Sequence, residues 1–282
     1  MTTFAVLGAG GMLGRAWVEL LRTRDRAVRP IGRPELDLTD EATVAKVIDG
    51  SAEVVVNCAA YTDVDGAEAD EGTATQVNGH AVGWLVRRAD EVGARLVHYS
   101  TDYVFAGQAD APYPVDAPTA PVNAYGRSKL VGEQHLRASP GEHLLIRTSW
   151  LYAPWGKNFV RTIHRLARER DHLRVGDDQR GRPTRAEALA DTSLRLVERS
   201  AAGVFHGTDS GECSWYDLAR HIAEQAAPRC RVDPCGSDEF PRPAPRPSYS
   251  VLDASGTDAL GGPAPGWRAS VSEVVERLAT EA

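Results

Sequence analysis

A short apolar run, a glycine-rich turn and a helical pattern open the 282-residue chain, and they limit its possible folds more than any other feature. The run is Phe4–Leu7, the turn is Gly8–Gly14 (Gly-Ala-Gly-Gly-Met-Leu-Gly), and apolar residues at helical spacing continue to Leu21. Glycines placed after a strand let the backbone approach a pyrophosphate, which then rests on the helix N-terminus. The segment favours a dinucleotide-binding unit over a plain tight turn.

Strands and helices continue to alternate through residue 150. Apolar runs occur near residues 27–31, 53–60, 95–99 and 143–152, and the run at 53–60 is nearly continuous, as in a parallel strand covered on both faces. We predict an α/β fold with a doubly wound parallel sheet (Rossmann) over residues 1–150. A smaller C-terminal α/β lobe would bind the substrate over residues 151–282, with residues 203–208 as candidates to return to the sheet.

Composition excludes several classes of protein. The net charge of −7 argues against nucleic acid as the main partner. No apolar run approaches the ~18 residues of a membrane span, and the first residues lack the charged region of a signal peptide. The four cysteines show no spacing typical of a metal site. We expect a cytoplasmic protein that binds no membrane and no metal.

The end of the second predicted strand bears on the choice of cofactor. NAD enzymes commonly carry an acidic residue there for the ribose hydroxyls, whereas an arginine accommodates a 2′-phosphate. This chain has Gly32-Arg33, which favours NADPH and leaves NADH as the alternative. Asp37 follows closely, and it either reaches the adenine amino group or belongs to a surface turn.

Tyr125 and Lys129 form the candidate catalytic pair. Residues four apart share one face of a helix, so the phenol and the ammonium would point into the same space. An adjacent cation lowers a phenol's pKa, and such a tyrosine could protonate a carbonyl oxygen while a hydride reaches the carbon. Thr101, at the end of an earlier strand, could be a second donor to the oxygen. The alternative is a solvated helix face on which the two side chains meet by chance. Only three of the 32 Lys and Arg residues are lysines, so a chance Tyr-x-x-x-Lys spacing is uncommon in this chain.

Two arginine-rich segments suggest an anionic substrate such as a nucleotide diphosphate. Residues 161–185 hold eight arginines against four acids, although a solvated helix would account for at least half of them. In the proline-rich loop at 241–247, Arg246 is the better candidate for a phosphate contact.

Together these motifs resemble the extended short-chain dehydrogenases/reductases, and within them the dTDP-4-dehydrorhamnose reductase family with the related 4-ketoreductases of antibiotic deoxysugars. The most specific match is Ser100–Phe105 (Ser-Thr-Asp-Tyr-Val-Phe). The matching stretches follow the family order along nearly the whole chain: Gly8-x-x-Gly11-x-x-Gly14, Val56–Asp65, Ser100–Phe105, Tyr125-Gly126-x-x-Lys129, Arg147–Tyr152, Asp178–Thr184 and Arg246-Pro247.

The resemblance implies NADPH-dependent reduction of the C4 ketone of a dTDP-4-keto-6-deoxyhexose. Tyr125 would donate the proton, Lys129 would lower its pKa and hold the nicotinamide ribose, and Thr101 would bond the keto oxygen. The cofactor-binding residues expected from motif and resemblance are Gly8, Gly11, Met12, Leu13, Gly14, Arg33, Asp37, Leu38, Ala60, Tyr61, Thr62, Tyr125 and Lys129. The expected substrate-binding residues are Thr101, Asp102, Trp150 and Arg246.

Other activities of this scaffold fit the residues less well. A dehydratase needs a carboxylate pair after the catalytic threonine, but Tyr103 follows Asp102 here. An epimerase retains its cofactor, whereas Arg33 favours an exchangeable NADPH. A regulatory subunit, such as the one of a methionine adenosyltransferase, would not need an intact catalytic set. Some family members bind magnesium at a dimer contact through a residue matching Glu187; we expect no metal, and a homodimer is one option.

Overall fold

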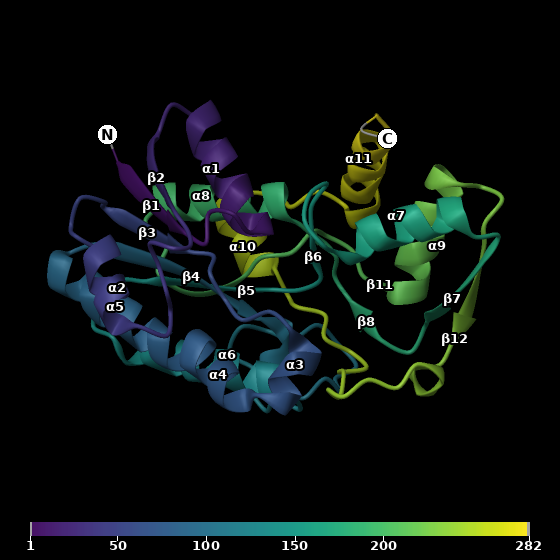
Figure 1. The fold of residues 1–282 in the computed structure, drawn as a ribbon, viewed down its shortest axis with the longest axis horizontal. Coiled ribbons are helices and arrows are strands. Elements are labelled where there is room, and N and C mark those ends of the chain that lie inside the picture. Colours follow the sequence, from purple (N-terminus) through teal and green to yellow (C-terminus); the bar gives the residue numbers. More distant parts are fainter. Residues whose placement is uncertain (1, 281–282) are drawn as a thin grey trace.

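The computed structural model describes residues 2–280 and has two lobes of unequal size (Figure 1). The larger lobe is built on a six-stranded sheet in the order β10-β5-β4-β3-β1-β2, with every pair parallel. Its strands are β1 (Thr3–Leu7), β2 (Ala27–Ile31), β3 (Val54–Asn57), β4 (Arg95–Thr101), β5 (Leu144–Thr148) and β10 (Gly203–His206). The predicted doubly wound Rossmann sheet is therefore confirmed.

Helices cover both faces of this sheet. The covering helices are α1 (Met12–Thr23) and α8 (Ala186–Glu198) on one face, and α2 (Glu41–Val47), α5 (Ala81–Val92) and α6 (Ala124–Ala138) on the other. Burial on both faces explains the continuous apolar run of β3, because Val54 and Val56 enter one core while Val55 enters the other. Between β3 and α5 lie α3 (Val64–Ala69), α4 (Glu71–Thr75) and a π-helical turn (Gln76–His80).

Side-chain caps fix where several of these helices begin. Asp63 accepts from the Gly66 backbone N–H at the start of α3, and Asp70 accepts from the Thr73 N–H at the start of α4. Each carboxylate satisfies a backbone donor that has no partner within the helix. Other acids of the run at 63–71 form contacts with distant residues: Asp65 pairs with Arg242 and Arg246, and Glu71 pairs with Arg127.

The smaller lobe packs three helices around a core of its own. These helices are α7 (Phe159–Glu169), α9 (Trp215–Ala226) and α11 (Trp267–Thr280). The short strand pairs are β6 (Leu151–Tyr152) with β9 (Thr184–Arg185), β7 (His172–Gly176) with β12 (Arg231–Cys235), and β8 (Arg180–Gly181) with β11 (Cys213–Ser214). Within residues 2–280, no helix is both long enough and apolar enough to span a bilayer.

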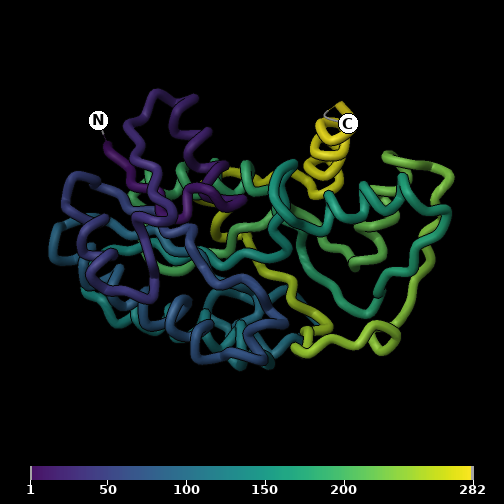
Figure 2. The backbone as a smooth tube through the Cα atoms, viewed as in Figure 1, coloured from purple at the N-terminus to yellow at the C-terminus, as the bar shows by residue number. Residues whose placement is uncertain are grey.

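The chain does not stay in the smaller lobe once it has entered it (Figure 2). Helix α8 packs on α1, β10 extends the sheet beside β5, and α10 (Ser255–Gly261) packs on both α8 and β10. Residues 203–206 thus return to the sheet, as the sequence allows. The division into domains at residue 150 stays a prediction.

A buried ion pair joins the sheet to α6. Arg147 on β5 donates to both carboxylate oxygens of Glu133, with Nε–Oε1 and Nη2–Oε2 distances of 2.8 and 2.7 Å, and both side chains are 0% exposed. The same guanidinium donates to the Val115 carbonyl at 2.9 Å. One side chain therefore connects the sheet, the helix that carries Tyr125 and Lys129, and the loop that precedes this helix.

We predict that Arg147→Met lowers the free energy of unfolding by about 3 kcal/mol, because Glu133 keeps its buried charge and loses its main partner. Denaturant unfolding of the purified protein measures this. Arg165→Met, which breaks an exposed pair with Glu169, should cost less than about 1 kcal/mol. Equal losses in the two variants would contradict the prediction.

Candidate active site

A cleft of about 860 Å³ lies at the carboxyl ends of the sheet strands. It is centred between β1 and β3, where the chain reverses its direction of winding across the sheet. Open α/β sheets bind ligands at this point because the loops leaving the two neighbouring strands turn to opposite faces. The segments that leave β1, β2, β3, β4 and β5 all contribute to the lining.

The glycine-rich turn brings the start of α1 close to the sheet. Gly8 has φ +73°, and a Cβ there would lie 2.7 Å from the Ala59 nitrogen, while a Cβ on Gly14 would lie 2.1 Å from the Gly8 carbonyl oxygen. Gly8 and Gly11 line the cleft, whereas Gly14 is a packing residue behind it. No side chain among residues 2–280 caps α1 at Gly11, and its first turn holds no acidic residue. These N–H groups suit a pyrophosphate.

The remaining expected cofactor residues line the same cleft: Met12, Leu13, Arg33, Asp37, Leu38, Ala60, Tyr61, Thr62, Tyr125 and Lys129. Arg33 is exposed and forms no ion pair with any residue in the range 2–280. The Asp37 carboxylate accepts from the backbone and side chain of Thr39, at 2.8 and 2.7 Å, and these bonds lower its pKa. Asp37 therefore closes a surface turn at the edge of the cleft.

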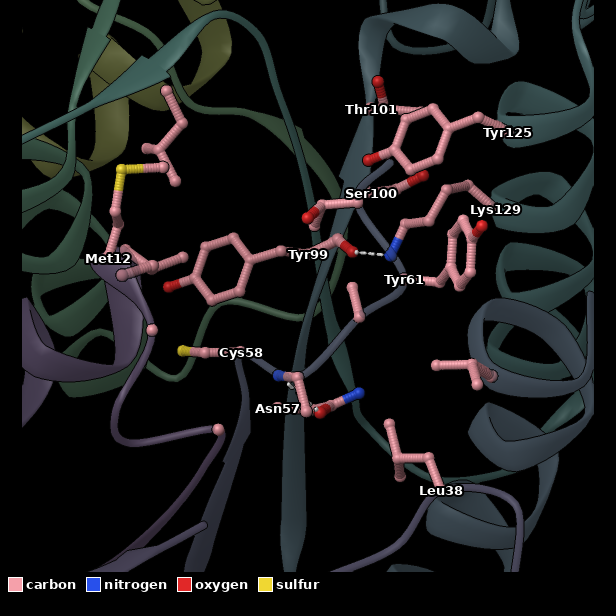
Figure 3. A pocket seen from close by; sticks show the side chains of 18 of the residues that line it. Met12, Leu38, Asn57, Cys58, Tyr61, Tyr99, Ser100, Thr101, Tyr125 and Lys129 are labelled. Atoms are coloured by element: carbon pink, nitrogen blue, oxygen red, sulfur yellow. Dashed lines mark hydrogen bonds between the residues drawn. The ribbon is translucent and has the colours of Figure 1, made fainter. Parts of the chain in front are cut away.

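Tyr125 and Lys129 point into the same part of the cleft from the first turns of α6 (Figure 3). Asn123 caps this helix by accepting from the Gly126 N–H at 2.8 Å. A Cβ on Gly126 would lie 2.2 Å from the Tyr103 carbonyl oxygen, so this glycine lets α6 press against the segment that follows β4. The close contact brings the Tyr125 phenol beside Thr101.

Burial dominates the electrostatics of this pair. Lys129 is 2% exposed, and burial lowers its pKa to about 8, although Glu133 acts to raise it. Burial raises the pKa of Tyr125, the Asp102 carboxyl raises it further, and a hydrogen bond with Thr101 opposes the rise. The pKa of Tyr125 is therefore raised overall, and the expected lowering by Lys129 stays a prediction. The Lys129 Nζ donates instead to the Tyr99 carbonyl at 2.6 Å.

Thr101 and Asp102 stand where β4 ends. The Thr101 hydroxyl donates to the Asp102 carboxylate at 3.0 Å, and it accepts from the Tyr103 N–H at 3.2 Å. Burial raises the pKa of Asp102 to about 7, with hydrogen bonds from Ser250 and Thr101 acting in the opposite direction. Near neutral pH this carboxyl can therefore either donate or accept a hydrogen bond.

Trp150 lines the cleft where the chain passes from the larger lobe to the smaller one. Its φ of +47° is unusual for a bulky residue and strains the backbone. The ring stacks on Trp215 of α9 with centroids 3.6 Å apart and planes 10° apart. Gly181 also lies against the ring, because a Cβ on this glycine would be 2.6 Å from it. The stack holds the strained backbone in place.

Arg246 does not line the cleft. Its guanidinium donates to Asp65 at 2.7 Å and to the Ala244 carbonyl at 2.7 Å, and it lies against Tyr103, which does line the cleft. Its predicted contact with a phosphate stays a prediction. Several arginines of the 161–185 segment pair with acids rather than standing free: Arg165 with Glu169, Arg174 with Glu239, Arg180 with Glu212 and Arg185 with Glu273.

Sequence reasoning missed several polar residues of the lining. These are Asn57, Ser100, Thr148, Ser149 and Lys157. All but Lys157 lie within one residue of the carboxyl end of a sheet strand. That position in the sequence could have marked them as residues of the cleft. Lys157 is one of three lysines in the chain, and this scarcity could have marked it. Cys58 is half-buried and also lines the cleft. Residues 2–280 hold no cluster of three or more His, Cys, Asp or Glu side chains that could bind a metal ion.

Comparison with known proteins agrees with this geometry. The family described as RmlD substrate binding domain matches residues 2–280. A dTDP-4-dehydrorhamnose reductase of Burkholderia thailandensis is 41% identical over 98% of this chain and 99% of its own length. A dTDP-4-keto-6-deoxy-D-glucose reductase of Streptomyces niveus is 45% identical over 88% of this chain and 87% of its own length.

Solved structures show the same relationship. A dTDP-4-dehydrorhamnose reductase from Clostridium acetobutylicum superposes with a TM-score of 0.94 at 37% identity, covering 99% of this chain and 100% of that one. One from Bacillus anthracis, in complex with NADP, has a TM-score of 0.92 at 34% identity, with both chains fully covered. The resemblance drawn from the motifs is confirmed. The chain belongs to the RmlD substrate binding domain family, together with the dTDP-4-dehydrorhamnose reductases.

Proposed function

We propose that this protein reduces the C4 ketone of a dTDP-4-keto-6-deoxyhexose with NADPH, in the biosynthesis of nucleotide-linked deoxysugars. The observation that carries the proposal is the meeting of Thr101, Tyr125 and Lys129 in one cleft with the glycine-rich turn. Two hydroxyl donors and a cation there suit a carbonyl oxygen that becomes negatively charged. The names of the curated relatives supply the substrate class.

The residues present fit NADPH. The N–H groups at the start of α1 would receive the pyrophosphate, and Arg33 would receive the 2′-phosphate. Lys129 would hold the nicotinamide ribose. When bound, NADPH supplies the hydride for the substrate carbon.

Tyr125 supplies the proton. Its raised pKa keeps the phenol protonated at neutral pH, so the proton is present when the keto oxygen gains charge. Thr101 donates a second hydrogen bond to that oxygen, once its hydroxyl proton turns away from Asp102. After the transfer, the ammonium of Lys129 stabilises the phenolate that remains.

The substrate would enter from the side of the smaller lobe. Trp150 offers a rigid aromatic surface there, and Asp102 offers a buried carboxyl beside the reacting oxygen. We assign both to the sugar nucleotide. The cytoplasmic location and the homodimer stay predictions.

A direct assay tests the proposal. Purified protein should oxidise NADPH when a dTDP-4-keto-6-deoxyhexose is added, which is measured as a loss of NADPH absorbance. NMR of the product should show a hydroxyl at C4. Binding of NADPH without turnover of any 4-keto hexose nucleotide in a panel would overturn the proposal and favour a regulatory subunit.

Tyr125→Phe should lower kcat by about 10²-fold or more, because general acid catalysis contributes about that much. The Kd for NADPH should stay within about twofold. Steady-state kinetics and NADPH fluorescence titration measure the two. Tyr216→Phe, in α9 and outside the cleft lining, is the matched control and should keep its kcat. A normal kcat in Tyr125→Phe would remove this residue from the chemistry.

Arg33→Ala should weaken NADPH binding by about tenfold or more and leave NADH binding unchanged, because only NADPH carries the 2′-phosphate and a charge-assisted hydrogen bond is worth about 1.5–3 kcal/mol. Calorimetry with both cofactors measures the ratio. Arg22→Ala, at the far end of α1, should change neither. An equal loss of affinity for NADPH and NADH in Arg33→Ala would show that another residue binds the 2′-phosphate.

NADPH affinity should fall as the pH rises above about 8. Burial lowers the pKa of Lys129 to about 8 in the folded protein, and the ammonium is the form that binds the ribose oxygens. The Kd for NADPH should be constant below this pH and should rise by up to tenfold per pH unit above it. Fluorescence titration from pH 6.5 to 9.5 checks this. Lys46→Met, on α2, should keep the pH dependence, and Lys129→Met should lose it.

A further inference from the structure

A chain of hydrogen-bonding groups runs from the backbone beside the glycine-rich turn to the Lys129 ammonium. The Ala59 N–H donates to Asn57 Oδ1 at 3.1 Å, and Asn57 Nδ2 lies 3.0 Å from His98 Nδ1. His98 Nε2 then lies 3.5 Å from Lys129 Nζ. Asn57 and His98 are each 1% exposed, so water does not replace these partners. The proposed chemistry gives neither residue a role.

The direction of every bond in this chain follows from its first member. A backbone N–H can only donate, so Asn57 Oδ1 accepts and the amide must turn its NH₂ group toward His98. His98 Nδ1 must then be an acceptor, which places the proton of the neutral imidazole on Nε2. Burial, followed by the charge of Lys129, lowers the pKa of His98, so the ring is neutral. His98 therefore presents an N–H to Lys129.

An N–H facing an ammonium is no hydrogen bond, because an ammonium has three donors and no acceptor. Among residues 2–280, the acceptor that Lys129 finds is the Tyr99 carbonyl at 2.6 Å, the bond drawn in Figure 3. Two N–H groups of the ammonium are thereby left without a protein partner. They lie in the wall of the cleft.

We propose that Asn57 and His98 are positioning residues that deny Lys129 a second protein acceptor and so reserve two of its N–H groups for the cofactor ribose. This inference rests on the proposed function, since the ribose is that of NADPH. Reversing the polarity of the chain would give the ammonium a second acceptor inside the protein. The Lys129 ammonium would then bind the cofactor ribose less well and would hold its proton more tightly.

Among the titratable groups around Lys129, His98 is the best position at which to test this inference. The titratable neighbours are Glu133 and Tyr125 on α6, His98 on β4, and Tyr61 after β3. Glu133 is paired with Arg147, and Tyr125 and Tyr61 line the cleft. A change at His98 alters the contact with Lys129 and adds no charge.

The tautomer of His98 can be observed directly. In the ¹⁵N-histidine-labelled protein without cofactor, long-range proton–nitrogen NMR should show His98 with a protonated Nε2 and an unprotonated Nδ1. In Asn57→Asp, the carboxylate can only accept, so the proton should move to Nδ1 and Nε2 should become an acceptor facing Lys129. A wild-type His98 protonated on Nδ1 would overturn the inference, whether or not the protein reduces any sugar.

The effect on Lys129 is tested by His98→Gln, whose amide can turn its oxygen toward the ammonium without adding a charge. We expect the Kd for NADPH at pH 7 to rise by about tenfold. The midpoint, which is the pH above which NADPH affinity begins to fall, should move upward by about half a pH unit or more. Asn57→Asp should move both quantities in the same directions. A packing defect alone would weaken binding without raising the midpoint.

His143→Gln is the matched control. It also replaces a buried histidine, but one that bonds the Leu96 backbone and Asp90 outside the cleft lining, so both quantities should stay at their wild-type values. An unchanged Kd and midpoint in His98→Gln would overturn the inference. If the wild type binds NADPH but turns over no keto sugar, the proposed reaction fails while the assignment of Asn57 and His98 stands. If it binds no NADPH, both fail.

Discussion

The site depends on the close contact between the glycine-rich turn and the segment that leaves the neighbouring strand β3. Gly8 approaches Ala59 so closely that any side chain at Gly8 would collide with backbone, and Gly14 presses α1 onto the same turn. Because β1 and β3 are neighbours in the sheet, the contact fixes where their carboxyl ends open. The cleft, the free N–H groups of α1 and the start of the Asn57–His98 chain all depend on this geometry.

Burial sets the protonation of the site more strongly than pairing does. It moves Tyr125 and Lys129 toward their neutral forms, since removing a charge from water costs more than a single neighbour returns. With a pKa of about 8, Lys129 is still about nine-tenths protonated at pH 7. The resting site thus holds a protonated phenol beside an ammonium, the state that a proton donor requires.

The sequence predicted the layers of the fold and most of the cleft, because each rests on a local pattern. A continuous apolar run predicts a strand covered on both faces, and glycines after the first strand predict the close turn. Tyr125 and Lys129 share a helix face by their spacing alone. The pattern could not predict what those side chains would contact: the Tyr99 carbonyl that accepts from Lys129 belongs to another strand.

The sequence could not show which distant residue would pair with each charged or polar side chain. Arg246 lies within the proline-rich loop at 241–247, and it pairs with Asp65, which is far away in the sequence. The arginines near α7 pair with acids from other elements in the same way. Asn57 and His98 look like core residues of apolar strands, and only the register of β3 on β4 brings them side by side.

In the proposed reaction the larger lobe would supply the chemistry and the smaller lobe would help to recognise the substrate, and the chain passes from one lobe to the other at Trp150. The sheet edge supplies Thr101, Tyr125 and Lys129, whose positions follow from strand register and helix packing. Trp150 lies two residues beyond the end of β5, but its ring stacks on Trp215 of the smaller lobe. A strained backbone persists only where surrounding contacts fix it. Changes in the smaller lobe can therefore reshape the cleft around Trp150 while Tyr125, the proposed proton donor, stays in place.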